Sequence, residues 1–230
     1  FDGSGQDELL WRNDASGQIQ WWKLSFKALG PLQHRGAIDF SYTVSPTLSA
    51  GSGYVPTVGD LNGDGYADLV WTNPANNATV VWINDQHGGF VHQNIADHPP
   101  GYHLFGAGDI NGDGKADLIW ADPTDRKLGW WLMNGFSVVG QSAQATPSGY
   151  QLAGVADYDG DGLADLLWTN AAGAALEWQG TGNGFQSFRV VDMAGNPLVI
   201  PAGMQVQASR TQGSGVGRVV GAAASVLAGN

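Results

Sequence analysis

A 13-residue segment occurs three times in this chain at a nearly constant interval. The copies are GDLNGDGYADLVW at residues 59–71, GDINGDGKADLIW at residues 108–120 and ADYDGDGLADLLW at residues 156–168, so the steps are 49 and 48 residues. A looser copy opens the chain at residues 2–11, and an eroded copy lies at residues 212–220. Internal repeats with periods of roughly 20–50 residues are typical of solenoids, propellers and other repeat arrays.

Each period predicts four short β-strands. In the second repeat they lie at residues 54–60, 68–73, 78–84 and 89–95, separated by turns rich in Gly, Pro, Asn and Asp. A mostly helical fold is excluded, because Gly makes up 35 of the 230 residues and glycine destabilises helix interiors. Four strands in about 48 residues match one blade of a β-propeller, whereas a parallel β-helix repeats at a shorter interval. We therefore predict an all-β fold, a β-propeller of four-stranded antiparallel blades.

Counting the repeats gives four to five blades in a single domain over residues 1–230. Residues 204–210 are placed to supply a strand that the first blade lacks, but residues 217–227 would then duplicate a strand already present. Three arrangements stay open: the chain closes its ring alone, assembles with a second copy, or forms part of a larger ring. The chain begins at Phe1 without a signal-like segment, so we expect a processed form or a fragment. The predicted repeats are approximately residues 1–53, 54–101, 102–149 and 150–203, with a degenerate repeat at 204–230.

The composition excludes several classes of partner and site. With 10 basic and 21 acidic residues the formal net charge is −11, which disfavours nucleic acid and anionic membrane surfaces. No stretch approaches the roughly 20 apolar residues that span a bilayer, so we expect no membrane insertion. The chain has no Cys, which excludes disulfides, thiol nucleophiles and cysteine metal clusters.

The repeated segment contains an acidic loop of nine residues. Oxygen-bearing side chains occupy its first, third, fifth and ninth positions, and glycines at the fourth and sixth positions allow the positive φ of a tight wrap. The backbone carbonyl of the seventh residue can complete the set, through Tyr66, Lys115 and Leu163 in the three loops. The predicted side-chain ligands are Asp60, Asn62, Asp64 and Asp68, then Asp109, Asn111, Asp113 and Asp117, then Asp157, Asp159, Asp161 and Asp165.

This pattern favours calcium. Ca²⁺ takes about 6–8 oxygen ligands in flexible geometry, whereas Mg²⁺ prefers fewer protein ligands and Zn²⁺ prefers His or Cys, which these loops lack. The alternative is that Asn-Gly-Asp-Gly is only a hairpin turn. A turn needs no further carboxylates in register, and without a cation those carboxylates would repel one another. We therefore predict about three Ca²⁺ sites.

The two outer copies of the loop depart from this pattern. The first has Asp2, Ser4 and Glu8 at its third, fifth and ninth positions, which predicts at most a weak metal site. The fifth has Arg210 and Arg218 where carboxylates belong, and these cations exclude Ca²⁺.

The motif Asp-x-Asn-Gly-Asp-Gly-x-Ala-Asp-Leu-x-Trp resembles FG-GAP/VCBS-type repeats. A Trp-x-x-Asn or Trp-x-x-Asp segment follows it, at residues 82–85 and 131–134. Such repeats form the calcium-loop blades of integrin α-subunit propellers and of many secreted bacterial and fungal proteins. The resemblance implies a β-propeller, one Ca²⁺ per intact loop, and an extracellular, secreted or cell-surface setting. Members of the family include adhesion proteins, propeller lectins and accessory regions of large enzymes.

Tryptophans recur at fixed places in each repeat. Trp71, Trp120 and Trp168 end the second strand, as Trp11 does in the first repeat, and we expect residues of this kind in the core between blades. Neighbouring strand residues face opposite ways, so one member of each doubled pair is expected to be exposed and to stack on a sugar. The candidate glycan-binding residues are therefore Trp21, Trp22, Trp130 and Trp131. Four histidines between residues 87 and 103 are expected in a solvated loop.

Three classes of function stay open. The leading hypothesis is a calcium-stabilised binding or adhesion module that recognises a glycan or an extracellular protein surface. The second is a structural subunit of a homo-oligomer or larger extracellular assembly, with purely structural Ca²⁺. The third is an enzyme, which we do not expect, because no Gly-x-Ser-x-Gly elbow, phosphate loop or dinucleotide fingerprint is present.

Overall fold

The computed structural model describes residues 1, 8–13, 15–27, 39–122 and 126–200. These residues form fifteen β-strands and no helix. None of them therefore forms a helix of the length and apolarity that crossing a bilayer requires. The strands are β1 Glu8–Asn13, β2 Gln18–Lys27, β3 Asp39–Val44, β4 Val55–Gly59, β5 Asp68–Asn73, β6 Ala78–Asn84, β7 Phe90–Asn94, β8 His103–Gly108, β9 Asp117–Asp122, β10 Lys127–Asn134, β11 Ser137–Ala145, β12 Tyr150–Ala156, β13 Asp165–Asn170, β14 Ala175–Gly180 and β15 Phe185–Arg189.

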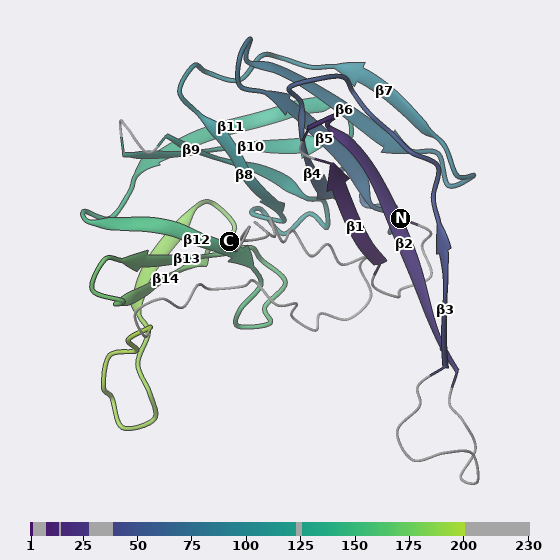
Figure 1. Cartoon of the computed structure of the whole chain (residues 1–230). Helices are drawn as coiled ribbons and strands as arrows, with labels where there is room; N and C mark the ends of the chain where they lie inside the picture. The colour runs from purple at the N-terminus through teal and green to yellow at the C-terminus, as the bar shows by residue number, and fades with distance from the viewer. Residues whose placement is uncertain (2–7, 14, 28–38, 123–125, 201–230) are drawn as a thin grey trace, which may run out of the picture.

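The strands form four antiparallel sheets that follow one another along the chain. The first sheet is β1–β2–β3, the second β4 to β7, the third β8 to β11 and the fourth β12 to β15. Figure 1 shows them as the four blades of a β-propeller, which confirms the predicted all-β propeller fold. The predicted strands at 68–73 and 78–84 coincide with β5 and β6. The first sheet has three strands in the described part of the chain, and the degenerate repeat at 204–230 lies outside the described residues.

Both faces of an inner sheet are apolar because each is covered by a neighbouring sheet. Every residue of β5 is buried. Successive side chains of a strand point to opposite faces. Leu69 and Trp71 accordingly pack with Ile19 of the first sheet, whereas Val70 packs with Leu118 of the third. The core therefore consists of three apolar clusters, one between each successive pair of sheets.

Neighbouring sheets approach each other closely at Gly59 and Gly108, the last residues of β4 and β8. A Cβ at Gly59 would lie 2.9 Å from Cβ of Ala116, and one at Gly108 would lie 2.8 Å from Cβ of Ala164. Real Cβ atoms do not approach this closely, so glycine is required at both places. The same contact includes backbone hydrogen bonds from Ala116 N–H to the Asp60 carbonyl and from Ala164 N–H to the Asp109 carbonyl, both 2.6 Å.

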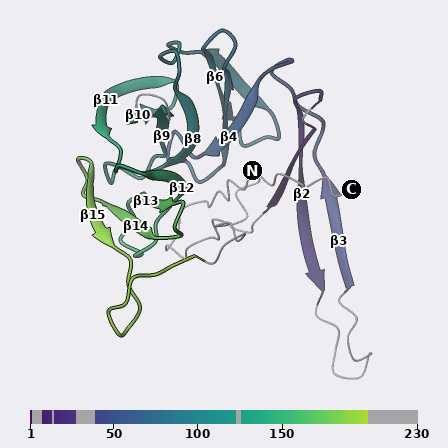
Figure 2. The same cartoon turned by 60° about the vertical axis from the view of Figure 1, so that its left-hand side comes forward.

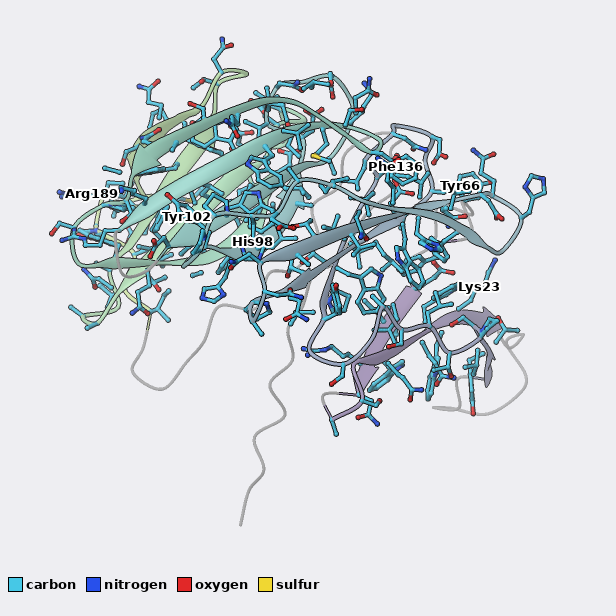
Figure 3. The ribbon with its side chains drawn as sticks, turned by 90° about the horizontal axis from the view of Figure 1, so that it is seen from above. Lys23, Tyr66, His98, Tyr102, Phe136 and Arg189 are labelled. Atoms are coloured by element: carbon cyan, nitrogen blue, oxygen red, sulfur yellow. The ribbon has the colours of Figure 1, made fainter. Side chains whose placement is uncertain are left out.

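The first and fourth sheets stand at the two ends of the series (Figure 2). Within the described residues, no strand of one pairs with a strand of the other. Figure 3 shows the arrangement from above, with the first sheet in purple beside the second. The described part of the chain therefore presents two end faces, one on each terminal sheet.

Candidate functional site

The first aspartate of each acidic loop organises the backbone around it. Asp60 accepts hydrogen bonds from the N–H groups of Gly63 at 2.7 Å and Gly65 at 2.8 Å. Asp109 and Asp157 accept the corresponding bonds in the other two loops, at 2.6–3.1 Å. All six glycines have positive φ as predicted, with values of 76°, 85°, 79°, 80°, 84° and 93° in chain order. The three loops therefore share one tightly wrapped conformation.

The third, fifth and seventh positions continue the wrap. In the second sheet's loop Asn62 Oδ1 accepts the Asp64 N–H at 3.0 Å, and Asp64 Oδ1 accepts the Tyr66 N–H at 2.8 Å. The equivalent bonds join Asn111, Asp113 and Lys115, and Asp159, Asp161 and Leu163. The seventh residue thus lies beside the oxygen set in each loop, and ligation through its carbonyl stays a prediction.

The ninth aspartate anchors each loop to the rest of its blade. Asp117 is fully buried, and its two carboxylate oxygens accept the N–H groups of Ile110 at 3.0 Å and Met133 at 2.8 Å. Ile110 lies in the loop and Met133 in the third strand of the blade, so one side chain joins both. Asp68 and Asp165 make the same pair of bonds at 2.8–2.9 Å.

Burial raises the pKa of the ninth aspartate in each of the three loops. Burial raises the pKa of Asp68 to about 7 and the pKa values of Asp117 and Asp165 to about 6, although the backbone N–H groups act in the opposite direction. Neighbouring loop carboxylates raise each pKa further, Asp159 in the case of Asp165. Each loop therefore places at least one buried carboxylate beside further, more exposed carboxylates, an arrangement that favours a bound cation.

The carboxylates converge in the fourth sheet's loop. One oxygen from each of Asp157, Asp159 and Asp165 lies within 4.8 Å of the other two. The other two loops carry an asparagine at the third position. In one of them the Asn62 amide donates to Asp64 Oδ2 at 2.9 Å. An all-oxygen set with several carboxylates matches the ligands of Ca²⁺, so the residues present fit this ion.

In the acidic loop of the first sheet, the structure describes Phe1 and Glu8. Glu8 accepts a hydrogen bond from the terminal ammonium group of Phe1. Asp2 and Ser4, its predicted partners in a weak metal site, lie outside the described residues, as do Arg210 and Arg218 of the fifth loop.

The tryptophans of the second strands are core residues in three of the four sheets. Trp71, Trp120 and Trp168 are 0%, 1% and 2% exposed, and each faces the preceding sheet. These three tryptophans confirm the expected aromatic core between blades. Trp11 differs, because it is 50% exposed.

The expectation that one residue of the Trp130–Trp131 pair is exposed is wrong. The two side chains do point to opposite faces of β10, but each face is covered by a neighbouring sheet. Trp130 is 5% exposed and packs edge-on against Phe185 of the fourth sheet, while Trp131 is 7% exposed and packs against Trp120. Neither side chain presents an open face for a sugar.

The Trp21–Trp22 pair lies in the first sheet, which has a covered face and an open one. Trp21 is on the covered face, stacked on Phe1 at 4.6 Å and in edge contact with Phe90. Trp22 is on the open face, between Trp11 at 5.0 Å and Tyr42 at 4.8 Å. We define the open face of the first sheet as the partly buried Trp22 together with four exposed residues, Leu9, Trp11, Tyr42 and Val44.

Three residues were placed differently or missed by the sequence reasoning. His98 is 3% exposed and stacks on Trp120 at 5.0 Å, so its expected place in a solvated loop is wrong (Figure 3). Trp11 and Tyr42 were not candidates for binding. No sequence signal marks Tyr42.

The chain matches one family model, described as an FG-GAP-like repeat, over residues 1–71, 60–120 and 109–168. No curated protein matches the chain. Among solved structures, a lectin of Agrocybe aegerita described as recognising non-reducing terminal N-acetylglucosamine has 15% sequence identity and a TM-score of 0.49, covering 84% of this chain and 65% of the lectin chain. A mutant Tc holotoxin pore of Photorhabdus luminescens has 17% identity and a TM-score of 0.41, covering 90% of this chain and 12% of that one. Both similarities concern the general arrangement of β-sheets.

Proposed function

Since the chain belongs to the family of FG-GAP-like repeat proteins, we propose that it is a calcium-stabilised extracellular binding module. Its recognition surface is the open face of the first sheet, and its ligand is a glycan or a protein surface. The observation that carries the proposal is the pairing of three near-identical acidic loops with an aromatic face that is exposed in the described part of the chain.

The calcium part rests on the chemistry of the loops. Asp157, Asp159 and Asp165 bring three carboxylate oxygens together. A divalent cation offsets their mutual repulsion and stabilises the native state, since the unfolded chain has no preformed site. Lys115 provides partial compensation in one loop, where its ammonium lies 3.3 Å from Asp113 Oδ2.

The recognition part rests on the open face. Trp and Tyr rings combine a large apolar area with a polar group, and they are enriched at the centres of binding interfaces. Trp11 and Tyr42 are 50% and 51% exposed, and Leu9 and Val44 are 45% and 46% exposed beside them. A contiguous apolar patch of this kind marks an interaction site more often than a scattered set of single residues does.

A calorimetric titration tests the calcium part. Decalcified protein should bind about three Ca²⁺ per chain, and Asp161→Ala should bind one fewer while its fold is retained. The matched control is Asp192→Ala, an exposed aspartate outside the loops. The absence of binding at millimolar Ca²⁺ would refute the proposed cofactor.

Glycan and extracellular-protein arrays at 2 mM Ca²⁺ test the recognition part. Binding should be saturable and should be lost in Trp11→Ser. It should persist in Val139→Ser, which removes from β11 an apolar side chain that is 59% exposed, compared with 50% for Trp11. Binding that Trp11→Ser leaves unchanged would show that the recognition surface lies elsewhere.

A further inference from the structure

A continuous hydrogen-bonded path joins the acidic loops of the second and third sheets. The Asp60 carbonyl accepts the Ala116 N–H at 2.6 Å. The Leu61 N–H, which shares a planar peptide group with the Asp60 carbonyl, donates to Asp68 Oδ2 at 2.8 Å. The Ala116 N–H in turn shares a peptide group with the carbonyl of Lys115, the seventh-position ligand predicted in the next loop. Two peptide groups therefore connect the ninth ligand of one loop with the seventh ligand of the next.

The same path joins the loops of the third and fourth sheets. The Asp109 carbonyl accepts the Ala164 N–H at 2.6 Å, and the Ile110 N–H donates to Asp117 Oδ2 at 3.0 Å. The carbonyl at the other end of the Ala164 peptide group belongs to Leu163, the predicted seventh-position ligand of the fourth sheet's loop. The middle loop therefore takes part in both paths, whereas each outer loop takes part in one.

The peptide dipoles of a path are aligned. In a trans peptide group the carbonyl and the N–H point in opposite directions, so the two groups of a path stand head to tail. Hydrogen bonds in such a chain polarise one another, and they are stronger where water is excluded. Asp60 and Leu61 are 4% and 0% exposed, and Asp68 at the end of their path is fully buried. Polarisation of the Lys115 carbonyl therefore strengthens the hydrogen bonds that hold Asp68 in the neighbouring loop.

The path also lowers the entropic cost of ordering a second loop. A binding event costs less conformational entropy where an earlier event has already fixed the same groups. Ala116 lies between two predicted ligands, Lys115 and Asp117, so ordering of the middle loop also orders the N–H that donates to Asp60. Repulsion between bound cations acts in the opposite direction. Salt screens this repulsion, because the fifth-position aspartates of the loops are exposed or only partly buried.

We propose that the three calcium sites bind their ions with positive cooperativity, which these paths transmit between adjacent loops. The inference rests on the proposed function, because it describes the regulation of the proposed calcium sites. The middle site affects both outer sites directly, and the outer sites affect each other only through the middle one. The three loops therefore fill over a narrow range of Ca²⁺ concentration, and the second, third and fourth sheets are stabilised together.

Calorimetric titration of decalcified protein tests the coupling, because removing one site leaves two that are either adjacent or separate. Asp161→Ala leaves the adjacent loops of the second and third sheets. Asp113→Ala leaves the loops of the second and fourth sheets, which no hydrogen bond joins in the described part of the chain. Proteins that combine two of the substitutions Asp64→Ala, Asp113→Ala and Asp161→Ala give the affinity of each site alone, which corrects for differences between the sites.

The expected result distinguishes the two pairs of sites. In Asp161→Ala the product of the two dissociation constants should be smaller than the product of the single-site values by about fivefold or more. In Asp113→Ala the two products should agree, although the substitution is of the same kind at the same loop position.

A second test separates two loops without changing a ligand. An added Cβ at Gly108 would lie 2.8 Å from Cβ of Ala164, and its next side-chain contact would be with Val155 at 3.7 Å. In the Asp64→Ala background, Gly108→Ala should therefore weaken the hydrogen bond from Ala164 N–H to the Asp109 carbonyl and reduce the coupling of the two remaining sites. Faster hydrogen exchange of the Ala164 amide reports the first effect. Adding Ala164→Gly should restore the space and the coupling, and Ala164→Gly alone is the control.

The outcomes separate this inference from the proposed function. Equal products for Asp161→Ala and its single-site proteins would overturn the cooperativity and leave calcium binding intact. Equal cooperativity in Asp113→Ala would also overturn the inference, because it indicates coupling through the whole fold. The calorimetric comparison replaces only exposed or partly buried aspartates, so it decides the question even where Gly108→Ala does not fold. The absence of binding to the wild-type chain at millimolar Ca²⁺ would refute the proposed calcium sites, and the inference with them.

Discussion

The clearest prediction separates two roles within one acidic loop. Asp117 holds two backbone N–H groups in a buried site, whereas Asp113 is a proposed metal ligand with a side chain 34% exposed. Replacing either residue by alanine should remove the ion. Only Asp117→Ala should also release the loop from the third strand of the blade.

The size of the effect follows from the hydrogen bonds that are lost. Asp117→Ala leaves the N–H groups of Ile110 and Met133 buried without an acceptor, and each such group costs about 1–3 kcal/mol. The free energy of unfolding should therefore fall by roughly 2–6 kcal/mol, which corresponds to a decrease in Tm of roughly 4–24 °C for a chain of this size. Asp113→Ala removes only its bonds to Lys115, worth about 1 kcal/mol or less.

Thermal unfolding in excess chelator is the appropriate assay, because it removes the contribution of the ion from all three proteins. The expected order of Tm is wild type, then Asp113→Ala slightly below it, then Asp117→Ala well below both. Asp117→Asn should fall between the two variants, since its amide oxygen can still accept one of the N–H groups.

Equal Tm values for Asp113→Ala and Asp117→Ala in chelator would refute the reasoning. Such a result would mean that the ninth aspartate contributes only through the metal.

Three further predictions follow from the same structure. Because burial raises the pKa of Asp68 to about 7, and those of Asp117 and Asp165 to about 6, the folded chain holds these protons more tightly than the unfolded chain does. The free energy of unfolding in chelator should therefore rise as the pH is lowered from 8 towards 5. Saturating Ca²⁺ should abolish or reverse this trend, because protons compete with the ion. A Tm in chelator that falls over this pH range would contradict the raised pKa values of these three aspartates. Added Ca²⁺ should raise the Tm of decalcified protein in proportion to the logarithm of its concentration above the dissociation constant, and unchanged melting curves would show that the ions do not hold the fold. In urea unfolding of dilute protein, Trp168→Ala should cost about 3–5 kcal/mol, whereas Trp11→Ala should cost less than about 1 kcal/mol because half of that side chain is already exposed; equal costs would show that Trp11 is buried in solution.

The fold could be predicted because the residues that determine the structure of a blade recur within each repeat of the sequence. Glycines at the fourth and sixth loop positions, the strand that follows Asp68, and the period of 49 residues each indicate a blade, and the structure has the same strands. The double role of the ninth aspartate could not be predicted in this way. Its second partner, for example Asn84 N–H for Asp68, lies 16 residues further along the chain and is brought close only by strand pairing.

Exposure was the quantity that the sequence predicted least well. Alternation along a strand correctly places Trp130 and Trp131 on opposite faces of β10, but alternation does not tell which faces are covered. That depends on the position of a sheet in the series. Both tryptophans of the doubled pair are therefore buried in the third sheet, whereas Trp22 of the first sheet is only partly buried.

The backbone hydrogen bonds between neighbouring loops have a mechanical consequence. Asp60 is joined to Ala116 and Asp109 to Ala164, so the three loops are connected in series along the inner rim. The middle loop is held on both sides and the outer two on one side each. A tensile load applied across these blades would therefore pass through both contacts in turn. Either outer loop would be freed when one contact breaks, whereas the middle loop would be freed only when both contacts break.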